Sequence, residues 1–177
     1  MNIYHIVPAN LSGITLYPLN MLQEKFSDLA EFHDKKYIGR ERLKEVVIPV
    51  LNCLWNDVLH FSPIHPTKIK AAFFQYNFTW TPRKWFVFDS EAPVFNKSKT
   101  LIFHPPIWRL VNYEVTQSDF ESYEEKVLQK YQEFPQISHD YFIKCQSTQV
   151  RPYLFNHSAH FLYKGTVRVE GADIIEV

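Results

Sequence analysis

The sequence predicts a single α+β domain, residues 1–177, with mostly antiparallel strands in split sheets and two or three helices. Its length is common for one domain, and 46% apolar and 16% aromatic residues are enough to build a substantial core. Strand-like and helix-like segments do not alternate regularly, which disfavours a doubly wound parallel sheet. The sequence also contains no internal repeat, low-complexity tract or linker that would divide the chain.

The composition argues against several classes of protein. Lys and Arg number 19, as do Asp and Glu, so the chain lacks the basic excess that holds proteins on nucleic acid. Four glycines against eleven prolines disfavour glycine-rich phosphate loops. The two cysteines, Cys53 and Cys145, make no disulfide framework. Because there is no signal-peptide pattern and no apolar run of about 18 residues, we expect a cytoplasmic protein without a membrane span.

The first part of the chain is expected to hold one strand and one long helix. β-Branched and aromatic residues predict a strand over Asn2–Val7, which Pro8 stops. A loop with a turn at Gly13 follows. After Pro18 an amphipathic helix is indicated, and Gly39 ends it. Its apolar face has helical spacing: Leu22, Phe26, Leu29 and His33.

The middle of the chain mixes short elements. A short helix is expected over Arg40–Val47, whereas Val46–Trp55, which Pro49 interrupts, is open between helix and strand. Another helix is expected to begin at Pro66. Strands are expected at Asp57–Phe61, Trp85–Phe88, Thr100–Phe103 and Leu110–Val115.

The clearest helix start lies at Ser118, with Glu121 three residues later, because this spacing is that of a capping box. The apolar stripe of this helix is Phe120, Tyr123, Val127 and Tyr131. Strands are then expected at Tyr141–Cys145, His160–Tyr163, Thr166–Glu170 and Asp173–Val177.

Common catalytic motifs are absent: the sequence has no HExxH, GxSxG or GxxxxGK[ST]. The pairs His157/His160 and His60/His65 are spaced closely, but a zinc enzyme needs three converging ligands. Bonding of these imidazoles to backbone or water is the preferred interpretation, and no metal is predicted. Cys53 lies in an apolar run and is expected to be buried and inert.

The stretch YNFTWTPRKW, Tyr76–Trp85, interleaves aromatic residues with Arg83 and Lys84. Single-stranded nucleic acid is bound by such a combination of stacking and charge. An edge hairpin with basic residues on its solvent side has the same pattern. Without an overall basic excess the hairpin is the preferred interpretation, and nucleic acid is not an expected partner.

Four short stretches match, in the same order, segments of one protein family. Ile3–Ile6, IYHI, resembles the family's opening IYHIT, and Val58–Ser62, VLHFS, resembles its FIHFS segment before a helix. Lys99–Leu110, KTLIFHPPIWRL, is similar to its LVLLxIDPARL. His160–Gly165, HFLYKG, is similar to its closing PHLYGPLPLDAVV, with further matches at Val167, Ala172 and Ile174. By these stretches the chain resembles a small bacterial family of unknown function in the ADP-ribosyltransferase-like superfamily.

The resemblance covers a minor part of the chain, and Leu16–Trp55 and Gln117–Phe155 have no counterpart in that shorter family. It implies a cleft between two small antiparallel sheets that binds NAD. In it His5 would bond the nicotinamide ribose and Ser62 would hold the same sugar, while Phe61, Phe73 or Tyr163 would stack on nicotinamide. The residues implied to bind the cofactor are His5, Phe61, Ser62, His160 and Tyr163.

Strand alternation would place His60 and Ser62 on one face, near His5 and His160, if Phe61 points into the core. The alternative interpretation is structural: the imidazoles bond loop carbonyls, and Ser62 caps a turn before Pro63.

The sequence departs from the family pattern at the position of the catalytic carboxylate. Active transferases open the last strand with glutamate, and the matching position here is Thr166. Glu170 shares that strand face, and with His60 it is the candidate for catalysis. ADP-ribose would be transferred or hydrolysed through an oxocarbenium-like state that a carboxylate stabilises. The alternative is a catalytically inactive domain that binds a protein or peptide partner through an aromatic surface.

Overall fold

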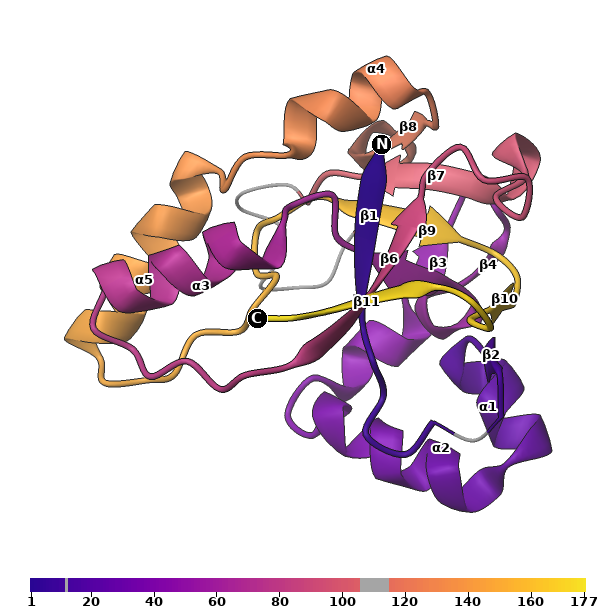
Figure 1. Ribbon diagram of the computed structural model, residues 1–177, viewed down its shortest axis with the longest axis horizontal. Coiled ribbons are helices and arrows are strands. Elements are labelled where there is room, and N and C mark those ends of the chain that lie inside the picture. The colour runs from indigo at the N-terminus through magenta and orange to yellow at the C-terminus, as the bar shows by residue number, and fades with distance from the viewer. Residues whose placement is uncertain (12, 106–114) are drawn as a thin grey trace.

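Two antiparallel sheets form the centre of the computed structural model, which describes residues 1–11, 13–105 and 115–177 (Figure 1). One sheet has the order β1 (Asn2–Ile6), β6 (Lys84–Asp89), β11 (Asp173–Glu176). The other has the order β5 (Leu59–Phe61), β9 (His160–Tyr163), β7 (Thr100–Phe103), β8 (Phe120–Ser122). Two small sheets pair β10 (Val167–Arg168) with β2 (Thr15–Leu16) and β3 (Val47–Ile48) with β4 (Cys53–Leu54). The predicted α+β class with antiparallel sheets is therefore confirmed.

The two large sheets meet at a bridge between β1 and the end of β5. The Tyr4 amide donates to the Ser62 carbonyl at 2.9 Å, and the Ser62 amide donates to the Tyr4 carbonyl at 2.8 Å. Because strand side chains alternate, Ile3 points into the core between the sheets and Tyr4 points to the outer face. Aromatic rings dominate the core between the sheets, among them Phe61, Phe86, Phe95, Phe161 and Tyr163.

Two helices cover part of the outer face of the three-stranded sheet. They are α3 (Pro66–Gln75) and α5 (Gln136–Ser147), which lie side by side (Figure 1). Phe73 of α3 and Phe142 of α5 are fully buried and approach each other at 5.2 Å between ring centres. Trp85 of β6 is buried in the same cluster. These helices thereby fix one side of the sheet that carries His5.

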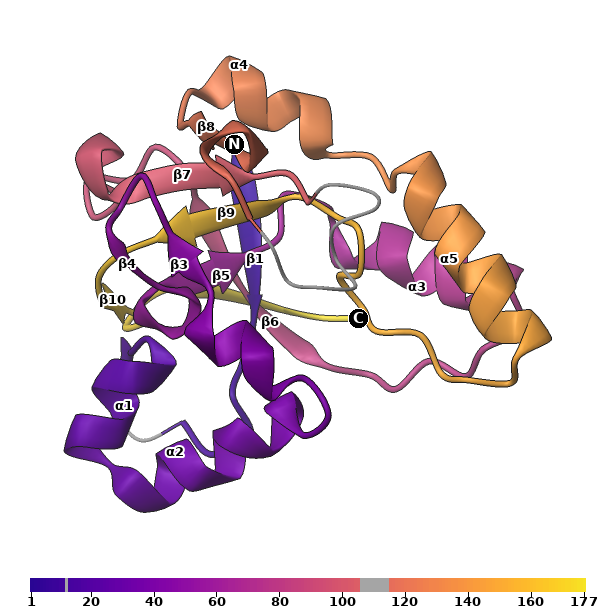
Figure 2. The ribbon, with the colours of Figure 1, turned by 180° about the vertical axis from the view of Figure 1, so that it is seen from behind.

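The far face of the four-stranded sheet is covered by the segment between residues 19 and 57 (Figure 2). This segment contains α1 (Leu19–Lys25), α2 (Ser27–Asp34), η1 (Lys35–Tyr37), η2 (Glu41–Glu45), β3, β4 and η3 (Trp55–Asp57). Tyr37, Ile48 and Trp55 pack there against Leu101 and Leu162 of the sheet. Inside this layer the Tyr37 hydroxyl donates to the buried Asn56 side chain.

Three sequence predictions of elements are wrong. The expected long helix after Pro18 breaks at Phe26, whose backbone is not helical (φ −147°, ψ 73°) and separates α1 from α2. Residues 118–122 do not start a helix: Asp119 caps the turn that Thr116 opens, in η5 (Gln117–Asp119), and Phe120 then pairs with Phe103 in the sheet. A helix follows later, as α4 (Glu125–Leu128) and η6 (Gln129–Tyr131).

The third error concerns Tyr141–Cys145, which belongs to α5 and not to a strand. Together with the break at Phe26, this gives more helical segments than the two or three expected. The segment Val46–Trp55, left open in the sequence, is the β3–β4 hairpin. The short helix expected over Arg40–Val47 is the 3-10 helix η2, and another 3-10 turn, η4 (Lys97–Lys99), precedes β7. Residues 110–114 of the strand expected at Leu110–Val115 lie outside the described residues.

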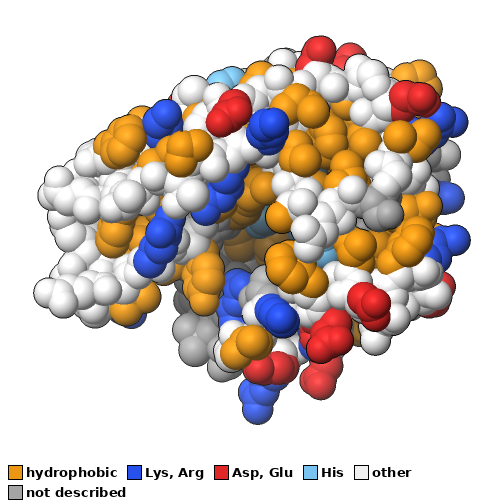
Figure 3. All heavy atoms as spheres, turned by 60° about the horizontal axis from the view of Figure 1, so that its bottom comes forward, with side chains coloured by type: hydrophobic (Ala, Val, Ile, Leu, Met, Phe, Trp, Pro, Cys, Tyr) orange, Lys and Arg blue, Asp and Glu red, His pale blue; other side chains and the backbone are white. Residues whose placement is uncertain are grey.

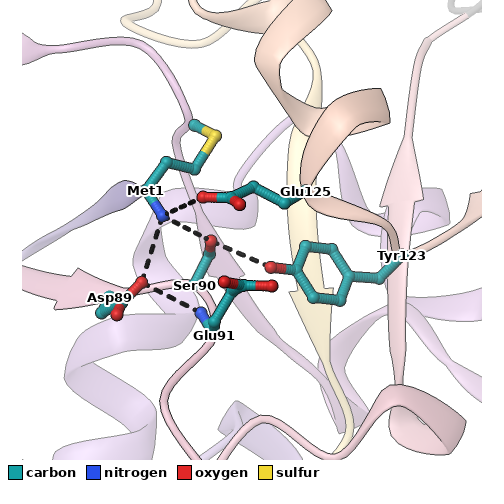
Figure 4. A network of polar contacts seen from close by, with 6 residues as sticks. All are labelled: Met1, Asp89, Ser90, Glu91, Tyr123 and Glu125. Carbon is teal, nitrogen blue, oxygen red and sulfur yellow. Dashed lines mark hydrogen bonds and ion pairs between the residues drawn. The ribbon is translucent and has the colours of Figure 1, made fainter.

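A polar network ties the start of the chain to β6 and α4 (Figure 4). The Met1 ammonium donates to Glu125 Oε1 at 2.7 Å, Asp89 Oδ1 at 3.1 Å and Ser90 Oγ at 3.3 Å. Tyr123 donates to Ser90 Oγ at 2.9 Å. Burial opposes the charge of the ammonium, but the bonds to Glu125 and Asp89 outweigh it and raise its pKa.

Across the parts of the chain that the structure describes, every helix is too short or too polar to cross a lipid bilayer.

Candidate functional site

The histidines of the second and fourth matching stretches meet on the far face of the four-stranded sheet. β5 pairs with β9 in the register His60↔Leu162 and Phe61↔Phe161, which puts His60 and His160 on the same face. Their ring centres are 5.7 Å apart. Trp55 stands beside both rings, at 4.6 Å from His60 and 6.4 Å from His160. The structure thus assembles an aromatic and imidazole cluster from η3, β5 and β9.

Main-chain groups and burial restrain these two imidazoles. His60 Nε2 lies 3.1 Å from the Trp55 carbonyl oxygen. Burial lowers the pKa of His160 to about 4, although a bond to the Phe155 backbone works in the opposite direction. His160 is therefore neutral at pH 7 and can exchange hydrogen bonds there but cannot supply a positive charge.

His5 lies on the opposite side of the four-stranded sheet. It shares the inward face of β1 with Ile3, and its ring centre is 5.4 Å from that of Phe61. Its Nδ1 lies 2.7 Å from the Ile6 carbonyl oxygen. Because Phe61 points toward β1, its neighbour His60 points away, so the three histidines do not gather on a single face.

Ser62 and the aromatic candidates are taken up by packing. Ser62 is buried, and its Oγ accepts from the Ile64 amide at 3.1 Å and lies 3.2 Å from the Ile64 carbonyl oxygen, so the side chain organises the turn before α3. Phe61 and Phe73 are 1% and 0% exposed. Tyr163 packs edge-on against Phe95 at 5.3 Å in the core between the sheets. None of these three rings offers an open face for stacking on a ligand.

Glu170 lies apart from the histidine clusters. It follows β10, and its carboxylate pairs with the Arg168 guanidinium while 64% of its side chain stays exposed. Thr166, the matching position of the family's glutamate, immediately precedes β10. The carboxylate therefore belongs to the small β2–β10 sheet, with an arginine as its partner.

Sequence reasoning missed a hollow of about 380 Å³ on the outer face of the three-stranded sheet. It is lined by Asn2, Tyr4, His65, Val87, Asp173, Ile174 and Ile175. Tyr4 and His65 approach at 4.9 Å between ring centres, and His65 Nδ1 accepts from the Thr67 amide at the start of α3. Burial, and then the charge of Lys68, lower the pKa of His65. The alternation of Ile3, Tyr4 and His5 was the available signal, since it directs Tyr4 outward.

The molecule is also hollowed on the face shown in Figure 3, where hydrophobic and His side chains lie inside and Lys and Arg side chains gather at the margins. No three His, Cys, Asp or Glu side chains converge as metal ligands within residues 1–11, 13–105 and 115–177.

Comparison with known proteins gives no relative: no family model, no curated protein and no solved structure matches the chain. The resemblance described above therefore rests on the four sequence stretches alone.

Proposed function

We propose that the protein is an ADP-ribosyltransferase-like domain that binds NAD or a related nucleotide. The supporting observation is that the four resembling stretches, separated in sequence, occupy neighbouring strands. The second, fourth and third supply β5, β9 and β7, which are adjacent in one sheet. The first is β1, which contacts β5 through the Tyr4–Ser62 bridge and shares β6 with β11. Segments 16–55 and 117–155, which have no counterpart, supply most of the surrounding layers.

His5 is the residue that we assign to the ligand's ribose. It lies at the junction of the two sheets, half-buried, beside the ring of Phe61. The Ile6 carbonyl accepts from Nδ1 and so restrains the orientation of the imidazole, and a neutral imidazole is a group that can hydrogen-bond the hydroxyls of a sugar. The stacking roles implied for Phe61, Phe73 and Tyr163 do not fit their burial, so the assignment concerns the sugar and not the nicotinamide ring.

Turnover is a separate part of the proposal. Transfer or hydrolysis of ADP-ribose breaks the bond between nicotinamide and ribose; nicotinamide leaves with the bonding electrons, and an acceptor oxygen bonds the sugar carbon and loses its proton. Glu170 and His60 are the residues assigned to this step by the resemblance. Because Glu170 is exposed and paired with Arg168, and His60 lies across the sheet from His5, binding and turnover need separate tests.

Titration calorimetry with NAD tests the binding. We expect binding at sub-millimolar concentration, a loss of tenfold or more in His5→Ala, and no change in His33→Ala, a histidine on α2 outside the resembling stretches. No heat at millimolar NAD, or equal affinity in His5→Ala, would refute the assignment. Release of nicotinamide, compared between the native protein and Glu170→Gln, tests turnover independently.

A second candidate function is binding of a protein or peptide partner without catalysis. The observation that favours it is a set of exposed apolar side chains on the segment that covers the four-stranded sheet: Phe26, Phe32, Ile38, Val47 and Leu54. Ile38 is the most exposed, at 74%. Surfaces of this kind mark interaction sites in soluble proteins. A matched pair of variants tests this second function: Ile38→Ser on this segment and Ile143→Ser on α5. Only Ile38→Ser should reduce the association that light scattering detects. A strictly monomeric native protein would contradict the second function.

A further inference from the structure

Two arginines from distant parts of the chain meet at one threonine. Arg83, just before β6, donates from Nη1 to the Thr81 carbonyl at 2.7 Å. Arg151, in the loop after α5, donates from Nη2 to Thr81 Oγ1 at 3.1 Å and to the Thr79 carbonyl at 3.4 Å. Both guanidinium groups therefore lie within hydrogen-bond distance of the same residue, although 68 positions separate them in sequence.

Neither guanidinium pairs with a carboxylate anywhere in the described parts of the chain. Other basic side chains on the surface do have acidic partners: Lys44 with Asp34, Lys68 with Glu133 and Arg168 with Glu170. Burial lowers the pKa of Arg83, and the charge of Arg151 lowers it further, so the second part of the shift reflects two like charges that lie close together. Two like charges that contact one residue and share no acidic side chain disfavour each other unless an anion joins them.

The surrounding structure holds the pair in place without an acidic side chain. The Arg83 guanidinium lies over the Trp80 ring at 5.4 Å, and Trp80 Nε1 donates to the Val177 main-chain oxygen at 2.8 Å. The backbones of Arg83 and Val177 bond each other twice, at 3.0 Å each. Since a guanidinium has five N–H donors and these bonds use few of them, several donors remain for an oxyanion.

We propose that Arg83 and Arg151 form a binding site for a phosphate-bearing anion, with diphosphate as the group that best matches two adjacent guanidinium forks. Planar guanidinium groups bind phosphate oxygens in pairs, and two of them can neutralise both phosphates of a diphosphate. The site gives a role to Arg83 of YNFTWTPRKW, which the nucleotide proposal leaves without one. It goes beyond that proposal and does not require it.

Titration calorimetry with inorganic pyrophosphate tests the site. We expect binding at low ionic strength, a loss of tenfold or more in Arg83→Gln and in Arg151→Gln, and native affinity in Arg168→Gln, whose arginine is exposed like Arg151 but already paired with Glu170. Pyrophosphate should also raise the melting temperature of the native protein and not that of Arg151→Gln, whose fold loses only a surface side chain.

Three results would overturn the proposal: no binding of pyrophosphate, an equal loss in Arg168→Gln, or unchanged affinity in both site variants. A fourth would redirect it, because salt-dependent binding of a single-stranded oligonucleotide without any binding of pyrophosphate would assign the two arginines to a nucleic-acid backbone and contradict a small-anion site.

Discussion

Gly165 offers the sharpest test of the packing around the fourth matching stretch. A Cβ added there would lie 2.7 Å from Cε1 and 2.8 Å from Cζ and the hydroxyl of Tyr163. Carbon atoms in contact prefer about 3.5–4.0 Å, so the ring must move by roughly 1 Å. The backbone of Gly165 is not in the left-handed region, unlike Gly171 at φ +75°. Gly165 is thus needed for space and not for its conformation.

The cost of Gly165→Ala follows from what holds the Tyr163 ring. That ring is 7% exposed and packs edge-on against Phe95 at 5.3 Å, so it cannot swing into solvent without disturbing the core between the sheets. Overpacking in such positions costs about 1–3 kcal/mol. For a chain of this length, 2 kcal/mol corresponds to a decrease of about 4–8 °C in melting temperature.

Urea unfolding and calorimetry of a mutant cycle measure this cost. Tyr163→Leu removes the obstructing ring atoms, so the double variant with Gly165→Ala should be more stable than the sum of the two single changes predicts, by about 1–2 kcal/mol. Gly171→Ala is the control, because its added Cβ meets nothing within 4 Å and its cost of about 1 kcal/mol is conformational. Full additivity in the cycle, or a neutral Gly165→Ala, would refute the steric reasoning.

Three further outcomes follow from the polar groups. Glu125→Gln should lower the free energy of unfolding by about 1 kcal/mol at pH 7, because it removes the ion pair with the Met1 ammonium. Since the folded-state pKa of this ammonium is raised, the difference between native and variant stability should be full below pH 8.0 and be lost as pH rises through the folded pKa. Chemical denaturation at several pH values measures it. Burial lowers the pKa of His160 to about 4, so NMR should show a neutral imidazole down to that pH. Its contribution to stability should be full above pH 6.5 and fall as pH drops toward 4. An NMR titration midpoint near 6.5 would contradict the burial of this side chain. Tyr37→Phe leaves the buried Asn56 acceptor unpaired and should cost about 1–3 kcal/mol in urea unfolding, whereas a change below 0.5 kcal/mol would show that water replaces the bond.

Strands with local signals could be predicted from the sequence. Asn2–Ile6, Leu59–Phe61 and Thr100–Phe103 are apolar or alternating runs bounded by proline or polar residues, and each is a strand near its expected limits. The helix at Pro66 was also predictable, because proline suits a first turn and no other element competes for those residues. Local chemistry decided these elements, so sequence patterns were sufficient.

Elements decided by distant contacts could not be predicted in the same way. Ser118 and Glu121 have the spacing of a capping box, but Phe120 is more stable paired with Phe103 and buried beside Trp55. In α5, Phe142 is buried against Phe73, a contact that its neighbours in sequence do not reveal. Tertiary burial of an aromatic side chain overrode the local pattern in both places.

The candidate site shows the same limit, because the face of each histidine depends on sheet pairing. Alternation along β5 correctly separates His60 from Phe61, but only the bridge from Tyr4 to Ser62 reveals that β1 lies on the Phe61 side. His5 therefore joins Phe61, and His60 joins His160 under Trp55. A sequence-based argument had no means to assign the two groups to different faces.

This separation determines which groups a nucleotide ligand can reach together. His5 pairs with Phe86 on the inward face of β6. Arg83 lies three residues before Phe86, and its guanidinium lies over Trp80 of the outer cluster, so the side chains of His5 and Arg83 point to opposite faces of the three-stranded sheet. A dinucleotide bound by one ribose at His5 would have to pass around the end of this sheet for its phosphates to reach Arg83, and His60 and His160 lie on the far face of the four-stranded sheet. If NAD and pyrophosphate compete, and both His5→Ala and Arg83→Gln weaken NAD, the ribose and phosphate contacts belong to one site at this end of the three-stranded sheet. If pyrophosphate binds without affecting NAD, the protein has two independent sites, and the arginine pair recognises a different ligand.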